Sequence, residues 1–217
     1  MPLQNRVDPF GRIVAMSERG TLTGNRGIIH NESRQIVRQH ASKGWITCVL
    51  DWKDVRRKVM TGHKWTELFF LDEATALAAG HRPCGYCRSS DYEGFVAAWA
   101  LGNPDQAPQT GRRAPVIDAV MHTERRHHNG SKRTYAVNAD ELPPGVMYTA
   151  GGGDAWLVDE PGWARLWSFA GYTEEAPLPV GEVEVLTPPS VVNAISFGYR
   201  VSRVDRQRRP GGTGRFP

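Results

Sequence analysis

The chain has 217 residues, a formal net charge of +4 at pH 7 and a pI of about 9.1. Hydrophobic residues make up 40% of it and charged residues 23%, which is ordinary for a globular protein and excludes collagen-like, low-complexity and wholly disordered chains. No run of residues approaches the ~18 apolar positions of a membrane-spanning helix, and the N-terminal segment MPLQNRVDPFGR lacks the apolar core of a signal peptide. We therefore expect a cytoplasmic protein without a membrane partner, built as one large or two small domains.

The charge is distributed unevenly along the chain. Residues 140–185 carry nine acidic side chains and one basic side chain, a net charge of −8, so the rest of the chain carries +12. Basic residues concentrate at 112–133 and 200–217. These segments are either solvated loops and a mobile tail or an electrostatic footprint for phosphate groups.

The N-terminal half begins with segments of strand character. Runs rich in β-branched and aromatic residues occupy positions 45–52, 55–60 and 66–71, and short polar turns separate them. This pattern predicts an antiparallel strand meander.

Helical signals follow the meander. Asp72 is placed to cap a short helix over 73–79, and a second helix with one apolar face is expected from Ser90 to about Leu101. Pro115 opens a third helix, which leads into a basic loop.

The pattern of the C-terminal part predicts short strands separated by PPG, GGG and EPGW turns, with a last helix after Pro188. We expect an α+β fold: an antiparallel meander with a zinc-binding CxxC knuckle and short helices, followed by a small β-barrel or sandwich-like module. The expected parts are a zinc-binding α+β domain (1–102), a linker with a basic helix and loop (103–133), a small acidic β module with a terminal helix (134–199) and a basic mobile tail (200–217).

The segment RPCGYCR carries the strongest chemical signal. Two residues separate Cys84 from Cys87, a spacing that lets two thiolates chelate one ion. The flanking Arg82 and Arg88 favour the thiolate form. We favour the interpretation that these cysteines form a structural zinc site. The alternatives are a redox dithiol and two cysteines without a special role. The three cysteines of the chain are too few, and odd in number, for a disulfide framework.

Residues 69–88, FFLDEATALAAGHRPCGYCR, resemble the zinc-binding module of the Ada family of methyl-DNA repair and response proteins. The matching positions are Phe69, Phe70, Glu73, Ala74, Ala78, Ala79, Gly80, Arg82, Pro83, Cys84 and Cys87. The resemblance implies a four-ligand Zn²⁺ site that supports the fold and, in Ada itself, accepts a methyl group and contacts DNA.

This chain departs from that family in its upstream ligands. The family supplies two further cysteines before the strand, whereas only Cys48 is available here. Zinc takes four ligands, and we prefer His30 as the fourth because it lies in the Gly- and Asn-rich loop GNRGIIHNE. The other candidates are His40, His63, His81 and His122.

A competing interpretation uses the same cysteines for catalysis. His30 and Glu32, followed by the Pro-Cys-x-x-Cys segment, resemble the signature of zinc-dependent nucleoside and nucleic-acid deaminases, in which the Glu transfers protons. His122 and Glu124 form a second His-x-Glu pair. The candidate catalytic residues, if the protein is an enzyme, are therefore Glu32, His122 and Glu124.

The segment MHTERRHHNGSKR at 121–133 is a basic loop with a His pair. It suits a phosphate-contacting loop, a plain solvated loop or a nuclease centre. Trp65 and Tyr86 are candidates for stacking on an exposed base, with core packing as the alternative. The candidate nucleic-acid-binding residues are Arg82, Arg88, Arg112, Arg113, Arg125, Arg126, Lys132 and Arg133.

Together these features predict a zinc-binding, nucleic-acid-binding protein. DNA is the favoured partner, in repair or modification, and salt dependence is expected to be steep because phosphate contacts dominate affinity. The alternatives are a zinc-dependent hydrolase that acts on a nucleobase or phosphodiester, and a protein–protein adaptor whose acidic half docks a basic partner.

Overall fold

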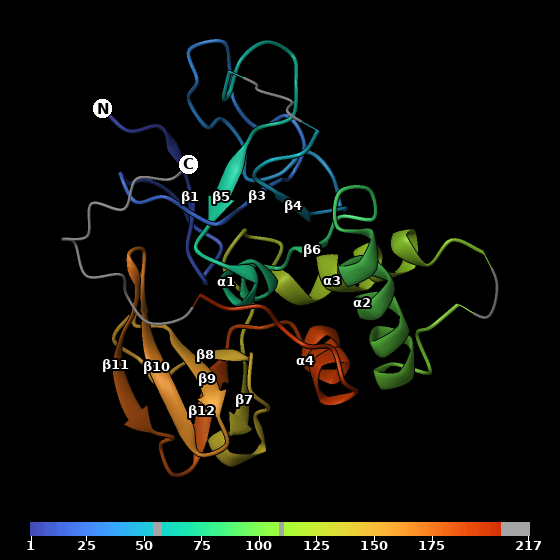
Figure 1. Ribbon diagram of the computed structural model, residues 1–217, viewed down its shortest axis with the longest axis vertical. Coiled ribbons are helices and arrows are strands. Elements are labelled where there is room, and N and C mark those ends of the chain that lie inside the picture. The colour runs from blue at the N-terminus through green and yellow to red at the C-terminus, as the bar shows by residue number, and fades with distance from the viewer. Residues whose placement is uncertain (54–57, 109–110, 205–217) are drawn as a thin grey trace.

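The computed structural model describes residues 1–53, 58–108 and 111–204, and it contains two six-stranded sheets and four α-helices in those ranges (Figure 1). The first sheet contains β1 (Gln4–Val7), β2 (Ile13–Ala15), β3 (Leu22–Asn25), β4 (Ile46–Val49), β5 (Leu68–Phe70) and β6 (Arg82–Pro83). The second contains β7 (Tyr135–Asn138), β8 (Met147–Thr149), β9 (Trp156–Glu160), β10 (Trp163–Ser168), β11 (Gly171–Pro177) and β12 (Glu182–Val185). The helices are α1 (Glu73–Ala78), α2 (Ser89–Gly102), α3 (Arg113–Arg125) and α4 (Pro189–Ser196), with a 3₁₀ turn η1 (Ala139–Glu141). The expected α+β class is confirmed.

The first sheet is mixed rather than a pure meander. Its strand order is β2-β1-β5-β3-β4-β6. The β3–β4, β3–β5 and β1–β2 pairs are antiparallel, whereas β1–β5 and β4–β6 are parallel. The predicted strands at 45–52 and 66–71 are not sequential neighbours in a meander, because β3 lies between β4 and β5. The parallel β4–β6 pair arises because the chain crosses through α1 before it returns to the sheet edge. The strand expected at 55–60 lies partly outside the described residues.

Helix α1 begins where the sequence predicts. The Asp72 carboxylate accepts a hydrogen bond of 2.9 Å from the backbone N–H of Thr75, which caps the first turn. The chain leaves the helix at Gly80, whose φ of +88° suits a residue without a Cβ. Helix α2 follows β6 and the turn that contains Cys84 and Cys87, and it buries Phe95 and Trp99 on its apolar face.

The second sheet is open. Its order is β11-β10-β9-β8-β12-β7 with every pair antiparallel. The edge strands β11 and β7 do not meet, so no closed barrel forms among the described residues, and the barrel alternative in the sequence prediction is replaced by an open sheet.

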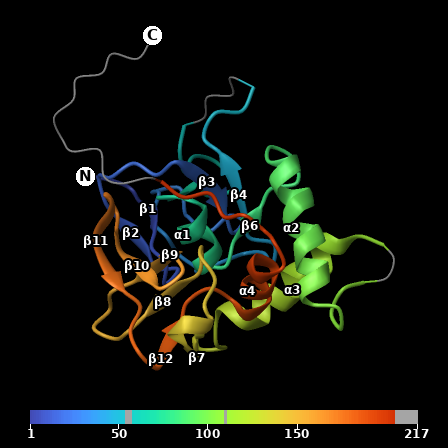
Figure 2. The same ribbon diagram turned by 60° about the horizontal axis from the view of Figure 1, so that its bottom comes forward.

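One hydrophobic core joins the second sheet to the helices. Phe95 and Trp99 of α2 pack with Ile117 of α3, Val185 of β12 and Val191 of α4. Figure 2 shows these helices grouped beside the second sheet. The core therefore takes side chains from both of the larger predicted domains.

The last described residues return to the first turn of α1. The Tyr199 hydroxyl donates to Glu73 at 2.7 Å, the backbone N–H of Ser202 donates to Glu73 at 2.9 Å, and that of Val204 donates to Asp72 at 3.3 Å. Figures 1 and 2 both show this segment, in red, passing beside α1. Two buried carboxylates at the start of α1 thus hold the C-terminal segment in place.

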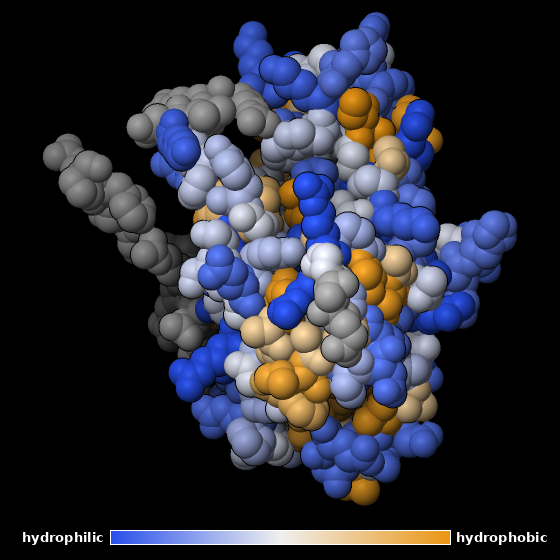
Figure 3. All heavy atoms as spheres, turned by 90° about the vertical axis from the view of Figure 1, so that its right-hand side faces the viewer, coloured by the Kyte–Doolittle hydropathy of each residue, from blue (hydrophilic) through white to orange (hydrophobic). Residues whose placement is uncertain are grey.

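None of the helices described is both long enough and apolar enough to cross a bilayer. On the face shown in Figure 3, hydrophobic side chains form small groups separated by hydrophilic ones.

Candidate metal centre and aromatic pocket

Three cysteine side chains converge beside the edge of the first sheet. Cys48 comes from β4, and Cys84 and Cys87 come from the knuckle after β6. The parallel pairing of β4 with β6 places Cys48 next to the knuckle. The Cys84 N–H extends this pairing by donating a hydrogen bond of 2.9 Å to the Thr47 carbonyl. The three Sγ atoms all lie within 4.8 Å of one another, so these cysteines could together hold a metal ion.

The knuckle directs polar hydrogens at sulfur. The Tyr86 backbone N–H donates to Cys84 Sγ at 3.4 Å. A hydrogen bond from the Cys48 thiol is the largest cause that lowers the pKa of Cys84 to about 5. The same contact raises the pKa of Cys48, and burial raises that of Cys87. Without a cation, the cluster therefore holds one thiolate and two thiols at neutral pH.

The structure brings together only some of the predicted zinc ligands. Cys48, Cys84 and Cys87 meet, whereas no histidine or carboxylate of the described residues joins them. His30 is buried elsewhere, with Nδ1 2.6 Å from the Thr66 hydroxyl. Its Nε2 has no hydrogen-bond partner within the described part of the chain.

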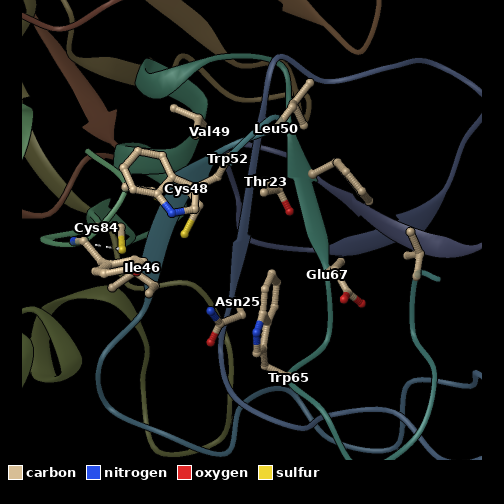
Figure 4. Close-up of a pocket in the computed structure, with 14 residues that line it drawn as sticks. Thr23, Asn25, Ile46, Cys48, Val49, Leu50, Trp52, Trp65, Glu67 and Cys84 are labelled. Atoms are coloured by element: carbon tan, nitrogen blue, oxygen red, sulfur yellow. Dashed lines mark hydrogen bonds between the residues drawn. The ribbon is translucent and has the colours of Figure 1, made fainter. Parts of the chain in front are cut away.

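The thiols form part of the wall of a pocket of about 310 Å³ (Figure 4). In Figure 4 the sulfur atoms of Cys48 and Cys84 lie on one side of this space and Glu67 on the other. The lining residues are Thr23, Asn25, Ile46, Cys48, Val49, Leu50, Trp52, Val59, Trp65, Glu67, Phe69, Cys84, Tyr86 and Cys87. The pocket therefore combines soft metal ligands with three large, partly polar aromatic side chains.

One face of the sheet supplies much of the lining. Thr23 and Asn25 alternate along β3, as Ile46 and Cys48 do along β4, so the two pairs point to the same side. Glu67, just before β5, is buried, and its Oε2 accepts a hydrogen bond of 2.7 Å from the Met60 N–H. Glu67, Asn25 and Trp52 were not identified from the sequence. Period-two alternation along β4 relates Ile46 to Cys48, whereas Asn25 lies on β3 and reaches the same face only through the β3–β4 pairing.

Trp65 and Tyr86, the two aromatics singled out in the sequence, both line the pocket. Tyr86 is 69% exposed, which is too open for a core residue. Lys53 Nζ lies 5.5 Å from the centre of the Trp52 ring and 5.7 Å from that of Tyr86. The rim near Tyr86 therefore carries exposed aromatic surface and a positive charge.

The arginines that flank the knuckle point inward. Both guanidinium nitrogens Nε and Nη2 of Arg82 bind the carboxylate of Asp118, at 2.8 and 2.7 Å. Arg88 binds Glu73 at 2.6 Å and Asp91 at 2.8 Å. Each arginine is only 7% exposed. Neither presents its charge to an outside phosphate, because an internal carboxylate holds it.

The other candidate nucleic-acid residues fall into two groups. Arg112, Arg113 and Arg133 are exposed, whereas Arg125, Arg126 and Lys132 turn into the protein and hydrogen-bond backbone carbonyls.

The three catalytic candidates lie outside the pocket lining. Glu32 is exposed. The His122 ring stands edge-on to His40 with centroids 5.3 Å apart. Glu124 accepts hydrogen bonds from the Ser190 hydroxyl (2.6 Å) and backbone N–H (3.3 Å), so it holds the start of α4. The structure does not bring these residues to the three thiols.

Comparisons with protein-family models, with curated proteins and with solved structures found no match to this chain.

Proposed function

We propose that the protein is a zinc protein whose Cys48, Cys84 and Cys87 bind Zn²⁺, and that its pocket takes an unstacked nucleic-acid base beside the ion. The observation that carries this proposal is that all three thiols share the wall of an aromatic-lined pocket. A site buried away from any cavity would support a purely structural ion instead.

The donor set favours zinc. Thiolates select soft or borderline ions, and Zn²⁺ is the borderline ion most often held by three or four such ligands. Zinc normally takes four ligands, and a site with three protein ligands leaves one position for water or an exogenous group. The described residues would supply three ligands, all of them in the pocket wall, and water or an exogenous group would fill the fourth position.

The rim favours a planar, anionic ligand. Base–aromatic stacking contributes about 1–3 kcal/mol per base and tolerates any sequence. Trp52 and Tyr86 offer ring faces, and Lys53 adds a cation where a phosphate would follow a stacked base. These are different residues from the arginines that the sequence predicted, but the ligand class is the same.

Tyr86→Ala tests the stacking. Because Tyr86 is largely exposed, its loss leaves the fold intact, and we expect affinity for a single-stranded oligonucleotide to fall by about 5- to 150-fold, the equivalent of one stacked base. The measurement is fluorescence anisotropy on the zinc-loaded protein at fixed salt. The matched control is Trp163→Ala, which removes a 47% exposed ring from β10. Equal affinities of the two variants would contradict base stacking at Tyr86.

A second function, a zinc hydrolase acting on the bound base, is favoured by Glu67. Its carboxylate is buried, lines the pocket and lies across it from the thiols. Zinc when bound supplies an activated water, and a nearby carboxylate is the usual proton carrier for that water. Glu67 would take the role that the sequence assigned to Glu32.

Glu67→Gln separates catalysis from binding. If Glu67 transfers protons, the zinc-loaded variant retains metal and oligonucleotide affinity but loses release of ammonia from cytosine- or adenine-containing strands, by about 100-fold or more. Glu32→Gln is the control and retains full turnover. A wild-type protein without turnover would leave the binding proposal in place and exclude the hydrolase.

A further inference from the structure

Four basic side chains meet on the far side of α1 from its capped end. Arg26 follows β3, Arg125 and Arg126 end α3, and Lys132 closes the loop that follows; we call these four residues the buried cation cluster. Arg26 is fully buried and Arg125 is 2% exposed. Arg126 and Lys132 are half-buried, so the cluster reaches solvent on their side.

Backbone carbonyls hold these cations in place. Arg26 Nη1 and Arg126 Nη2 each donate to the Gly11 carbonyl at 3.1 Å. Arg125 Nη1 donates to the Gly80 carbonyl at 3.1 Å, and Lys132 donates to that of Ala78. The last two acceptors lie at the C-terminal end of α1, where the helix dipole offers roughly half a negative charge.

That half charge does not balance four cations. None of the four forms an ion pair within 4.0 Å among the residues described. The carboxylates that act on them are already engaged, Asp8 by Arg12 at 2.5 Å and Asp118 by Arg82 at 2.7 Å. Taking a charge out of water without a partner costs several kcal/mol. Consistent with this, burial first and the neighbouring arginines second lower the pKa of Lys132 to about 7.

Unused hydrogen-bond donors accompany the excess charge. Arg26 Nη2, Arg125 Nε and His81 Nδ1 are buried and have no partner in the described chain. A Cβ on Gly11 would meet Arg26 Nη2, Arg126 Nη2 and the Ala79 carbonyl oxygen, each at the van der Waals contact distance of 3.6 Å. Two guanidinium groups therefore converge at a residue that has no side chain, next to one backbone carbonyl.

We propose that the buried cation cluster binds a phosphate group, whose oxygens accept from Arg26 and Arg126 beside Gly11 while Lys132 supplies a third positive charge. An oxyanion would offset the excess charge and satisfy the unused Arg26 donor at once, which a neutral ligand would not. The assignment also explains why the segment 121–133 is basic although most of its charge is turned inward. This site is separate from the cysteine pocket, since none of the four cations lines that pocket.

The test measures binding of inorganic phosphate to the zinc-loaded full chain, by calorimetry and by thermal unfolding, against sodium chloride at equal ionic strength. We expect Arg126→Gln to weaken phosphate binding by about tenfold or more, the value of one charge-assisted hydrogen bond, and Lys132→Gln to weaken it as well. Arg133→Gln, an exposed neighbour in the same loop, is the matched control and changes affinity by less than about twofold. If Arg126→Gln does not fold, the comparison of Lys132→Gln with Arg133→Gln decides.

Two outcomes would overturn the proposal: chloride raising the unfolding temperature as much as phosphate does, or the Lys132 and Arg133 variants binding phosphate equally. The source of the phosphate is resolved with a dinucleotide carrying a 5′-phosphate and its 5′-hydroxyl counterpart. Tighter binding of the phosphorylated dinucleotide than of inorganic phosphate identifies a nucleotide phosphate, and equal binding identifies the free oxyanion. Tyr86→Ala retains phosphate binding in either case, so this proposal and the pocket proposal fail independently.

Discussion

Replacing Cys84 with serine is expected to lower zinc affinity by more than about 100-fold, the upper end of the losses seen when only an outer-shell partner of a metal ligand is removed. A serine hydroxyl does not ionise near neutral pH and is a poor ligand for zinc, whereas the Cys84 thiol, with a pKa of about 5, is already a thiolate at neutral pH. The check is metal analysis of purified protein, with competition against a chromophoric chelator. Cys48→Ser and Cys87→Ser are expected to behave alike.

Zinc binding should also release protons in a countable way. At pH 7 the Cys84 thiol is already ionised, while the raised pKa values of Cys48 and Cys87 keep those thiols protonated. Because all three ligate as thiolates, binding should release about two protons. Calorimetry in buffers of different ionisation enthalpy counts them. Release of fewer than one proton, or a Cys48→Ser variant that retains zinc as well as the parent does, would exclude the three-cysteine centre.

The cysteine site was accessible from the sequence because its signal is local. Cys84 and Cys87 define a chelating turn by their spacing alone, and Cys48 was the only further thiol the chain offers. The position of Cys48 beside the turn depends on the parallel β4–β6 pair, which joins segments separated by a helix and leaves no periodic trace in the sequence. The sequence therefore identifies Cys48 as the third thiol, but it does not predict that Cys48 lies beside the knuckle.

The arginines show the opposite case. Arg82 and Arg88 sit beside the cysteines, and a basic residue next to a metal knuckle suggests contact with an outside anion. Their true partners are the carboxylates of Asp118 and Glu73, 36 and 15 residues away along the chain. Opposite charges at such distances carry no spacing signal, so composition alone does not distinguish an internal ion pair from a surface patch.

The fold followed the same division. The sequence predicts that Asp72 caps the start of α1 and that Gly80 ends it, because both effects depend on local backbone chemistry. The structure confirms both ends of the helix. For the second sheet the sequence predicts a barrel or a sandwich, because short strands and turns are common to barrels, sandwiches and open sheets. Closure depends on whether edge strands β7 and β11 meet, and their residues do not encode that in any local pattern.

Glu73→Ala is expected to destabilise the protein by about 3–5 kcal/mol, the cost of leaving a buried charge without its partner. Glu73 is 2% exposed and accepts from Arg88 at 2.6 Å, from the Tyr199 hydroxyl and from the backbone N–H of Ser202. Its loss leaves the Arg88 guanidinium with only the half-exposed carboxylate of Asp91 and removes the contacts that hold Tyr199 and Ser202 to α1. Urea unfolding monitored by tryptophan fluorescence measures the change.

Asp91→Ala is the matched control, because Asp91 binds the same guanidinium at 2.8 Å from a position where its side chain is 52% exposed. A solvent-exposed pair contributes about 0–1 kcal/mol. The free energies of unfolding of the two variants should therefore differ by at least about 2 kcal/mol. A smaller difference would mean that Glu73 does not hold Arg88 in place. Arg88 directly follows Cys87, and its backbone N–H donates to the Cys84 carbonyl at 3.1 Å. Freeing its side chain should therefore loosen the knuckle and weaken zinc binding in Glu73→Ala but not in Asp91→Ala, which would join the stability of α1 to the affinity of the metal centre.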